Sequence, residues 1–326
     1  MLSCAVLSKT VGKIWQDDGE VSFTELGYHG VLCLIIGGSA MHRATKWLLG
    51  CGLACLMGSV WAEAGPPVVH EPDGTAAGAK VELLWLGQSA IRLTTPGGKV
   101  ILIDPFITQN PKTPEHYKNL DNLGRIDLIL VTHAHGDHLG DGPALARKLH
   151  IPLIGPAGMS QSLIALGDLP QELALLMNKS GTVSPLGPNI TISMVHAEHS
   201  SELDWVNPAT GKHEIHAGGE PVGYIIQLEN GFRIYDMGDT GLFGDMKFIA
   251  DYYRPDLVLA PIGGNYTMGP TEAAFAIRYW LRPKYVLPFH YGTFPALTGT
   301  PEAFEKALGP TRTKVIELKP GGTVSF

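Results

Sequence analysis

The sequence has few cysteines, and all four of them (Cys4, Cys33, Cys51 and Cys55) precede residue 56. The long remainder therefore has no disulfide framework, no thiolate nucleophile and no thiolate metal ligand. Any metal ion that this remainder binds must be held by His, Asp or Glu side chains.

The sequence also lacks an excess of positive charge. Lys and Arg total 24 against 31 Asp and Glu, so the formal net charge is −7. A surface that binds nucleic acid is normally basic, and this balance therefore predicts no nucleic-acid partner. The length of 326 residues is enough for one large domain or two small ones with a sizeable core.

A third absence is an apolar run of the ~20 residues that a membrane span needs. From Met41 the chain reads MHRATKWLLGCGLACLMGSVWAEAGPP, in which basic residues precede a short apolar run from Trp47 to Val60. Small residues, Ala62 and Ala64, follow this run. The order is typical of a cleaved secretory signal peptide, and the alternatives are a membrane helix and a lipid attached at Cys51.

We therefore divide the chain into four parts. Residues 1–40 are an upstream extension that we predict is not native, because Met41 is the expected start. Residues 41–64 are the predicted signal peptide, and residues 65–79 are a leader rich in Gly, Pro and Ala. Residues 80–326 are the folded domain, which we expect in the periplasm or outside the cell without a membrane span.

Apolar runs bounded by turn residues alternate with helical patterns along the folded domain. The predicted strands cover residues 81–86, 90–94, 99–103, 127–132, 152–154, 190–195, 222–228, 232–235, 256–261, 284–289 and 314–318. The predicted helices cover residues 141–149 with Asp141 as N-cap, 159–166, 244–252, 271–281 with Thr271 as N-cap, and 301–308. This alternation indicates an α/β sandwich with two β-rich halves and helices outside.

One segment, VTHAHGDHLGD, concentrates titratable side chains directly after a predicted buried strand. His133, His135, Asp137 and His138 form the pattern H-x-H-x-D-H. Alternation at the strand end is expected to place His133, His135 and Asp137 on one side. Imidazole and carboxylate groups together bind zinc, iron and related metals, so the pattern favours a metal site over a solvated loop.

Three further predicted strands also end in polar clusters. The segment HAEHSS contains His196 and His199, DMGDTG contains Asp236 and Asp239, and HYGT begins with His290. Loops at the ends of strands commonly carry functional side chains. We therefore expect these residues to converge with the histidine-rich segment on one edge of the fold.

These segments resemble the metallo-β-lactamase superfamily, whose hallmark is T-H-x-H-x-D-H. The matching segments are WLGQSAIRL, ILIDPFI, LILVTHAHGDHLGD, AEHSS, GDTGLF, PIGGNYTMGP and PFHYGTFP, within roughly Val81 to Phe326. The resemblance is greatest to bacterial metal-dependent hydrolases that include L-ascorbate-6-phosphate lactonase. It implies a four-layer αββα sandwich, and it makes residues 80–326 a metallo-hydrolase domain with a metal site at the sheet edges.

The resemblance also implies a ligand set for two divalent metal ions. The first ion would be bound by His133, His135 and His199, the second by Asp137, His138 and His290, and both by Asp239. His199 is preferred to His196 because the related pattern reads A-x-H-S-S. Zinc is the expected metal, with manganese or iron as alternatives. Gln88 departs from the family, since relatives often have His there, and an amide cannot titrate near neutral pH.

The implied reaction is hydrolysis of an ester, lactone or phosphodiester by a hydroxide that bridges the two ions. Asp137 is expected to orient this nucleophile as well as to bind metal, and Tyr291 is predicted to contact the substrate. Asn265 and Met268 are expected to line the pocket. The expected partner is a small-molecule substrate, and the oligomeric state is left open.

Further polar residues are expected to lie outside the ligand set. Asp104 and Asp236 are expected to fix the ligand histidines from outside. The loop that follows His199 contains His213 and His216, which are expected to face solvent. Two alternative functions stay open: a β-lactam-hydrolysing enzyme, whose family members lack the bridging aspartate, and a non-catalytic metal-binding module of the same fold.

Overall fold

The structure is a computed structural model that describes residues 80–326. The predicted upstream extension, signal peptide and leader lie outside the described residues, so these boundaries and the expected location stay predictions. Within the described part, the strands form two seven-stranded sheets and one two-stranded hairpin. None of the helices in residues 80–326 combines the length and the apolar character that crossing a bilayer requires.

The first sheet has the strand order β16-β1-β2-β3-β4-β5-β6. Its strands are β1 (Glu82–Gly87), β2 (Ala90–Thr94), β3 (Val100–Ile103), β4 (Leu128–Leu130), β5 (Leu153–Pro156), β6 (Ala174–Met177) and β16 (Thr323–Ser325). Strands β16 to β3 pair antiparallel, and strands β3 to β6 pair parallel. As a result, β1, β3 and β4 all run in the same direction.

The second sheet has the order β15-β14-β13-β12-β11-β8-β7. Its strands are β7 (Thr182–Val183), β8 (Thr191–His196), β11 (Val222–Gln227), β12 (Arg233–Asp236), β13 (Leu257–Pro261), β14 (Tyr285–Phe289) and β15 (Lys314–Val315). Strand β11 runs antiparallel to both of its neighbours, whereas β12 to β15 are parallel. The carboxyl ends of β8, β12 and β14 therefore lie at one edge of this sheet.

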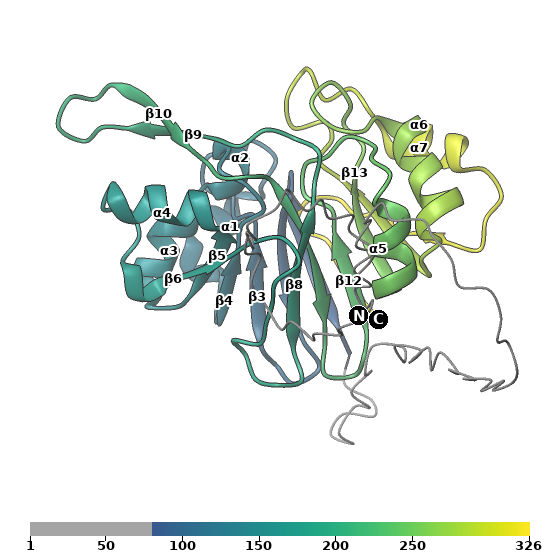
Figure 1. Cartoon of the computed structure of the whole chain (residues 1–326). Coiled ribbons are helices and arrows are strands. Elements are labelled where there is room, and N and C mark those ends of the chain that lie inside the picture. The colour runs from purple at the N-terminus through teal and green to yellow at the C-terminus, as the bar shows by residue number, and fades with distance from the viewer. Residues whose placement is uncertain (1–79) are drawn as a thin grey trace, which may run out of the picture. The chain divides into compact units, whose positions relative to one another are not determined.

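Helices cover the outer face of each sheet (Figure 1). The first sheet carries α3 (Gly142–Leu149) and α4 (Ala157–Ala165), while the second carries α5 (Met246–Tyr253), α6 (Pro270–Phe275) and α7 (Pro301–Leu308). Shorter helical segments are α1 (Glu115–Lys118), η1 (Leu120–Leu123), α2 (Gly136–Leu139), η2 (Gln171–Leu173) and the π-helical η3 (Ala276–Leu281), which continues α6. The predicted four-layer αββα sandwich is confirmed.

The alternation of side chains along each strand explains these layers. In β1, Leu83 and Trp85 join the apolar core between the two sheets, whereas Leu84 and Leu86 join the core under the helices. Because both faces are buried, such strands read as continuous apolar runs. Burying one side chain of this size contributes about 1.5–3 kcal/mol to folding, which makes the sheets a firm support for the loops at their ends.

Several local predictions are wrong in detail. The helix predicted from Thr271 begins at Pro270 with Gly269 at its N-cap, because proline is preorganised for the first helical position. Asp141 does occupy the N-cap position of α3, but its side chain makes no cap bond. Its Oδ2 atom instead accepts hydrogen bonds from the backbone of Ile107 and Thr108, and so ties the loop after β3 to α3.

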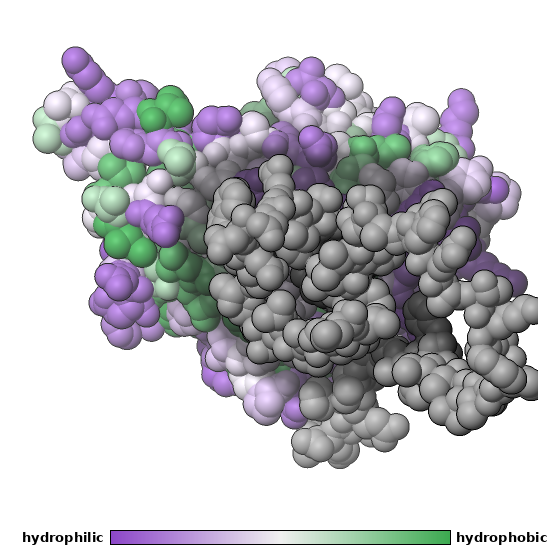
Figure 2. Space-filling view, viewed as in Figure 1, coloured by the Kyte–Doolittle hydropathy of each residue, from purple (hydrophilic) through white to green (hydrophobic). Residues whose placement is uncertain are grey.

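The segment after His199 was expected to be a loop, but it forms a hairpin of β9 (Glu202–Val206) and β10 (His213–Ala217). The hairpin projects beyond α4 and α2 (Figure 1), and its surface has both hydrophilic and hydrophobic areas (Figure 2). Trp205, near the turn of the hairpin, ties it to the rest of the domain, because the indole Nε1 donates to Asp168 Oδ2 at 2.5 Å. The strands contain few buried residues, so no apolar run in the sequence indicates them.

Candidate metal centre

The histidine-rich segment leaves β4 and turns directly into the short helix α2. The carboxylate of Asp104 holds its start: Oδ1 accepts from the backbone N of Thr132 at 2.8 Å, and Oδ2 accepts from Thr132 Oγ1 at 2.7 Å. The helix ends at Gly140, where φ is 39° and a Cβ atom would lie 2.5 Å from the carbonyl oxygen of Pro105. Only glycine permits this close approach, which fixes the segment against the loop after β3.

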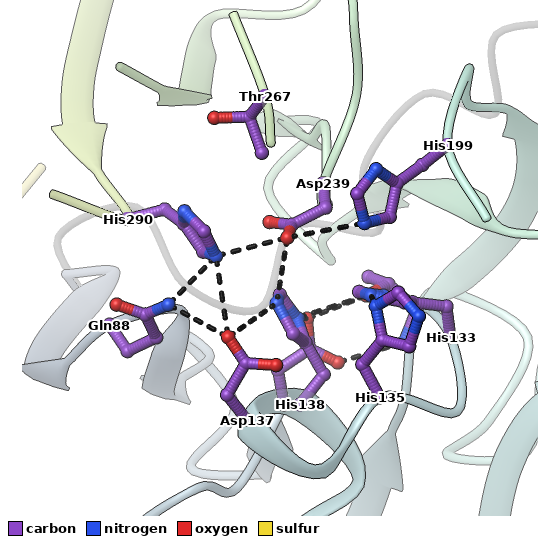
Figure 3. A network of polar contacts seen from close by, with 12 residues as sticks. Gln88, His133, His135, Asp137, His138, His199, Asp239, Thr267 and His290 are labelled. Carbon is purple, nitrogen blue, oxygen red and sulfur yellow. Dashed lines mark hydrogen bonds and ion pairs between the residues drawn. The ribbon is translucent and has the colours of Figure 1, made fainter. Parts of the chain in front are cut away.

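The structure brings the seven predicted metal ligands together in two groups (Figure 3). The tri-histidine group consists of His133, His135 and His199, and the carboxylate group consists of Asp137, His138, Asp239 and His290. In each group, one potential ligand atom per residue lies within 4.8 Å of the others. Because α2 begins at Gly136, Asp137 does not continue the strand alternation. The expectation that Asp137 shares a side with the first two histidines is wrong.

Asp239 lies between the two groups (Figure 3). Its Oδ2 atom is 3.0 Å from His290 Nε2 and 3.3 Å from His138 Nε2, and it is 3.7 Å from His199 Nε2 in the other group. A carboxylate in this position can reach a cation in either group. This is the position that the resemblance implies for a bridging ligand.

Both sheets contribute to the site because their strands end at a common edge. The segment with His133 and His138 follows β4 of the first sheet. His199, Asp239 and His290 follow β8, β12 and β14 of the second. The two sheets are joined directly here, since the backbone N of His290 donates to the carbonyl oxygen of Gln88 at 3.1 Å.

The electrostatics of the carboxylate group favour bound positive charge. Burial opposes ionisation of Asp239, but the neighbouring imidazoles of His138 and His290 hold its pKa well below the usual range. The pKa of Asp137 is likewise lowered, because His138 and a hydrogen bond from His290 outweigh burial. Conversely, Asp239 and Asp137 raise the pKa of His290 to about 9, against the effect of burial.

The tri-histidine group has the opposite character. Burial, together with the adjacent His138 imidazole, lowers the pKa of His133 well below its ordinary value. Burial also lowers the pKa of His199. The environment of His133 and His199 thus favours the neutral imidazole, which is the form that binds a metal ion.

The donor set fits divalent cations. His138 Nε2 and Asp239 Oδ1 are buried side-chain atoms without a hydrogen-bond partner in residues 80–326. Buried polar atoms are normally paired, and a cation between these groups would give both atoms a partner. Nitrogen and carboxylate oxygen ligands without thiolate suit zinc, and also manganese or iron.

Asp104 supports the site from outside, as expected. Its Oδ2 atom lies 2.7 Å from His138 Nδ1, which directs the Nε2 atom of this imidazole toward the carboxylate group. Asp236 does not act in this way, because its Oδ1 atom accepts from the backbone N of Gly238 at 3.0 Å. Burial, reinforced by the charge of Asp104, raises the pKa of Asp236 to about 8.

Gln88 contributes more than its departure from the family pattern indicates. It follows β1 in a left-handed backbone conformation with φ 51° and is fully buried. Its Nε2 atom donates to Asp137 Oδ2 at 2.9 Å and lies 2.8 Å from His290 Nε2 (Figure 3). The amide therefore holds in place one residue that follows a strand of each sheet. The segment WLGQSAIRL marks the position of Gln88 in the family pattern but does not predict these two contacts.

Replacing Gln88 with Leu is expected to lower kcat/KM about 10–100-fold, the usual effect of losing an outer partner of a metal ligand. Leucine keeps most of the side-chain volume but cannot hold the Asp137 carboxylate in place. The measurement is kcat/KM together with the metal content of the purified variant. Gln161→Leu, on the exposed face of α4, is the matched control. Equal activity of the two variants would contradict the role given to Gln88.

The three further histidines that the sequence analysis considered, His196, His213 and His216, belong to neither ligand group. His196 ends β8 and contacts Glu198 at 3.3 Å, which supports the choice of His199. His213 and His216 lie on β10, where they pair with Asp204 and Glu214. These contacts agree with the expectation that the two β10 histidines stay outside the site.

A cavity of about 820 Å³ opens over the two groups. Five predicted ligands form one side of it: His135, Asp137, His199, Asp239 and His290. Asn265 and Met268 were expected to line the pocket, but neither is among the residues that line this cavity. Tyr266 lines it instead, and Met268 is buried in the core beneath α6. Tyr291 is not among the lining residues. Its ring packs 5.5 Å from that of Trp85, so its catalytic role stays a prediction.

Comparison with known proteins agrees with this geometry. Residues 99–291 match the family model described as a β-lactamase superfamily domain. A UPF0173 metal-dependent hydrolase of Cupriavidus necator is 58% identical over 275 residues, which cover 84% of this chain and 94% of the relative. Another, from Polaromonas sp., is 53% identical over 286 residues, which cover 88% of this chain and all of the relative.

A solved structure of a metallo-hydrolase has a similar fold. Igni18, a metallo-hydrolase from the hyperthermophilic archaeon Ignicoccus hospitalis, aligns with a TM-score of 0.62 at 33% sequence identity. The alignment covers 76% of this chain and 98% of that structure. The narrower resemblance to L-ascorbate-6-phosphate lactonase stays a prediction.

Proposed function

Because the chain belongs to the β-lactamase superfamily and to its UPF0173 metal-dependent hydrolases, we propose that it uses two divalent metal ions to hydrolyse a small-molecule substrate. The proposed substrate is an ester, lactone or phosphodiester. The observation that carries this proposal is the position of Asp239, whose Oδ2 atom lies within 3.7 Å of imidazoles from both groups.

In this proposal the tri-histidine group would hold one ion, the carboxylate group would hold the other, and Asp239 would serve as a ligand to both. When bound, such ions lower the pKa of a coordinated water from ~15.7 toward ~7 and polarise the oxygen of the substrate. Zinc is the proposed metal because imidazole nitrogen dominates the donor set.

The side chains of the chain then have separate tasks. Asp137 has one carboxylate oxygen fixed by Gln88 and is a quarter exposed to the cavity, so it can accept a hydrogen bond from the attacking water and orient it. Asp104 keeps His138 in one orientation through its contact with Nδ1. The buried floor of the site limits the approach of the substrate to the open side of the cavity.

The proposal is tested by assaying the full chain, loaded with zinc, on simple esters, lactones, a phosphodiester and a β-lactam. We expect hydrolysis of at least one substrate from the first three classes, its loss in a metal chelator, and its return when zinc is added. Two results would overturn the proposal: no turnover by fully loaded protein, or full turnover by protein shown to contain no metal.

A further inference from the structure

We infer that the substrate of this site is an uncharged ester or lactone that carries an aromatic or similarly flat apolar group. The inference rests on the proposed hydrolase function and narrows it. The evidence for the inference is the set of residues that line the cavity but are not metal ligands. The ligand groups alone do not distinguish one hydrolysable bond from another.

This wall is aromatic. It contains Phe106, Tyr266 and Phe294, followed by the apolar segment from Pro295 to Leu297. The rings of Phe106 and Phe294 are 6.3 Å apart between centroids, at an angle of 35°. Phe294 is 38% exposed and Tyr266 is 61% exposed, so both rings present apolar surface to the cavity rather than to the core. Aromatic rings gain most from contact with another ring or a flat apolar group.

The lining residues outside the two ligand groups supply no cation. None of the residues within 80–326 that line the cavity is Lys or Arg. Next to the cavity, the acidic Glu202 has its Oε2 atom 3.1 Å from His135 Nε2. Sites that select phosphate or carboxylate groups normally provide Arg or Lys for them. A negatively charged part of a substrate that lies away from the scissile bond would therefore find no cationic side chain.

A neighbouring hollow of about 260 Å³ also lacks basic lining residues. It shares Phe106 and Gly136 with the main cavity, and its lining adds Asp141 and Asp204 but no basic residue. A phosphodiester carries one negative charge that its two non-bridging oxygens share, and the lining residues of the two hollows outside the ligand groups include no Lys or Arg to bind it. The charge pattern thus favours the ester and lactone classes over the phosphodiester class.

Backbone hydrogen bonds hold the aromatic wall in place relative to the ligands. The backbone N of Met268 donates to the carbonyl oxygen of Thr240 at 2.8 Å, which ties the Tyr266 loop to the residue that follows Asp239. A hydrogen bond closes the turn at Phe294: the backbone N of Leu297 donates to the carbonyl oxygen of Phe294 at 3.0 Å. A wall that is fixed before binding can select a substrate by its shape.

The test compares kcat/KM of the zinc-loaded full chain for three methyl esters, which share methanol as leaving group, and asks whether the chain also hydrolyses a phosphodiester. Methyl butanoate is small and neutral, methyl 3-phenylpropanoate is neutral and aromatic, and monomethyl succinate is small and anionic; bis(4-nitrophenyl) phosphate is an aromatic phosphodiester. We expect the aromatic ester to exceed methyl butanoate about tenfold, and the succinate to fall below methyl butanoate about tenfold.

Two variants connect this preference to the wall. Phe294→Ala is expected to remove most of the advantage of the aromatic ester over methyl butanoate. Phe294→Arg is expected to raise the succinate relative to methyl butanoate about tenfold, because it supplies the missing cation. Phe248→Ala, on the exposed face of α5, is the control and is expected to leave both ratios unchanged.

The outcomes separate the two proposals. Turnover of the succinate that equals or exceeds that of the aromatic ester, or turnover of the phosphodiester but of none of the esters, overturns the inference and leaves the hydrolase function standing. An aromatic preference that survives Phe294→Ala also overturns it. If metal-loaded protein hydrolyses none of these four substrates and none of the lactones in the broader panel, the hydrolase function fails, and the inference fails with it.

Discussion

Replacing Asp239 with Ala is expected to lower kcat/KM by about 10³-fold or more, on whichever substrate the protein hydrolyses. The reason is its shared position. A single oxygen, Oδ2, lies 3.0 Å from His290 Nε2 and 3.7 Å from His199 Nε2, so its loss affects both ligand groups at once. Loss of a histidine from one group would leave the other group intact.

The measurement for Asp239→Ala is kcat/KM together with the number of metal ions bound per chain. Asp245→Ala is the matched control, because Asp245 is exposed, precedes α5 and makes no side-chain cap bond. We expect the control to retain full activity and metal content. A metal content of two ions in Asp239→Ala, with activity within tenfold of the unchanged protein, would show that this carboxylate does not bridge the groups.

Removing the metal ions is expected to lower the thermal stability of the full chain as well as its activity. The ligands come from both sheets, and bound ions therefore connect β4 of the first sheet with β8, β12 and β14 of the second. An ion present at 1,000 times its Kd stabilises the folded state by about 4 kcal/mol. For a domain of this size, each kcal/mol shifts Tm by about 2–4 °C, so a decrease of about 8–16 °C is expected.

This decrease is measured by thermal unfolding with and without a chelator, followed by addition of zinc. Tm should return when zinc is restored. The Asp239→Ala variant provides the internal control, because a chelator should change its Tm by much less. If the unchanged protein loses its ions and keeps its Tm, the ions do not connect the two sheets in the way proposed.

The sequence predicts the sheets well because their strands are buried on both faces. Runs such as those of β1 and β13 are apolar at nearly every position, and few other structures bury a continuous run of this length. The hairpin of β9 and β10 escapes prediction for the opposite reason. Its backbone pairing is regular, but its side chains are mostly exposed, so nothing in their polarity marks two strands.

The candidate site is predictable to a similar degree. His133, His199, Asp239 and His290 each follow an apolar strand, and parallel strand ends meet at one edge. The spacing H-x-H-x-D-H allows the first two histidines to bind one ion while Asp137 and His138 reach a second, and the start of α2 one residue before Asp137 agrees with this division. The aromatic wall, in contrast, could not be predicted from the sequence. Phe106 and Phe294 lie 188 positions apart, in loops that come together only in the folded chain.

The edge strand β16 has a consequence for how the domain is completed. It pairs with β1, so that Ser325 lies opposite Glu82, and the whole second sheet is synthesised between them. Chains emerge from the ribosome beginning with the N-terminus, and β1 therefore lacks its outer neighbour until synthesis reaches the last strand. An unpaired strand edge can pair with another chain. Newly made molecules thus stay open to edge-to-edge association until β16 has been released and paired with β1.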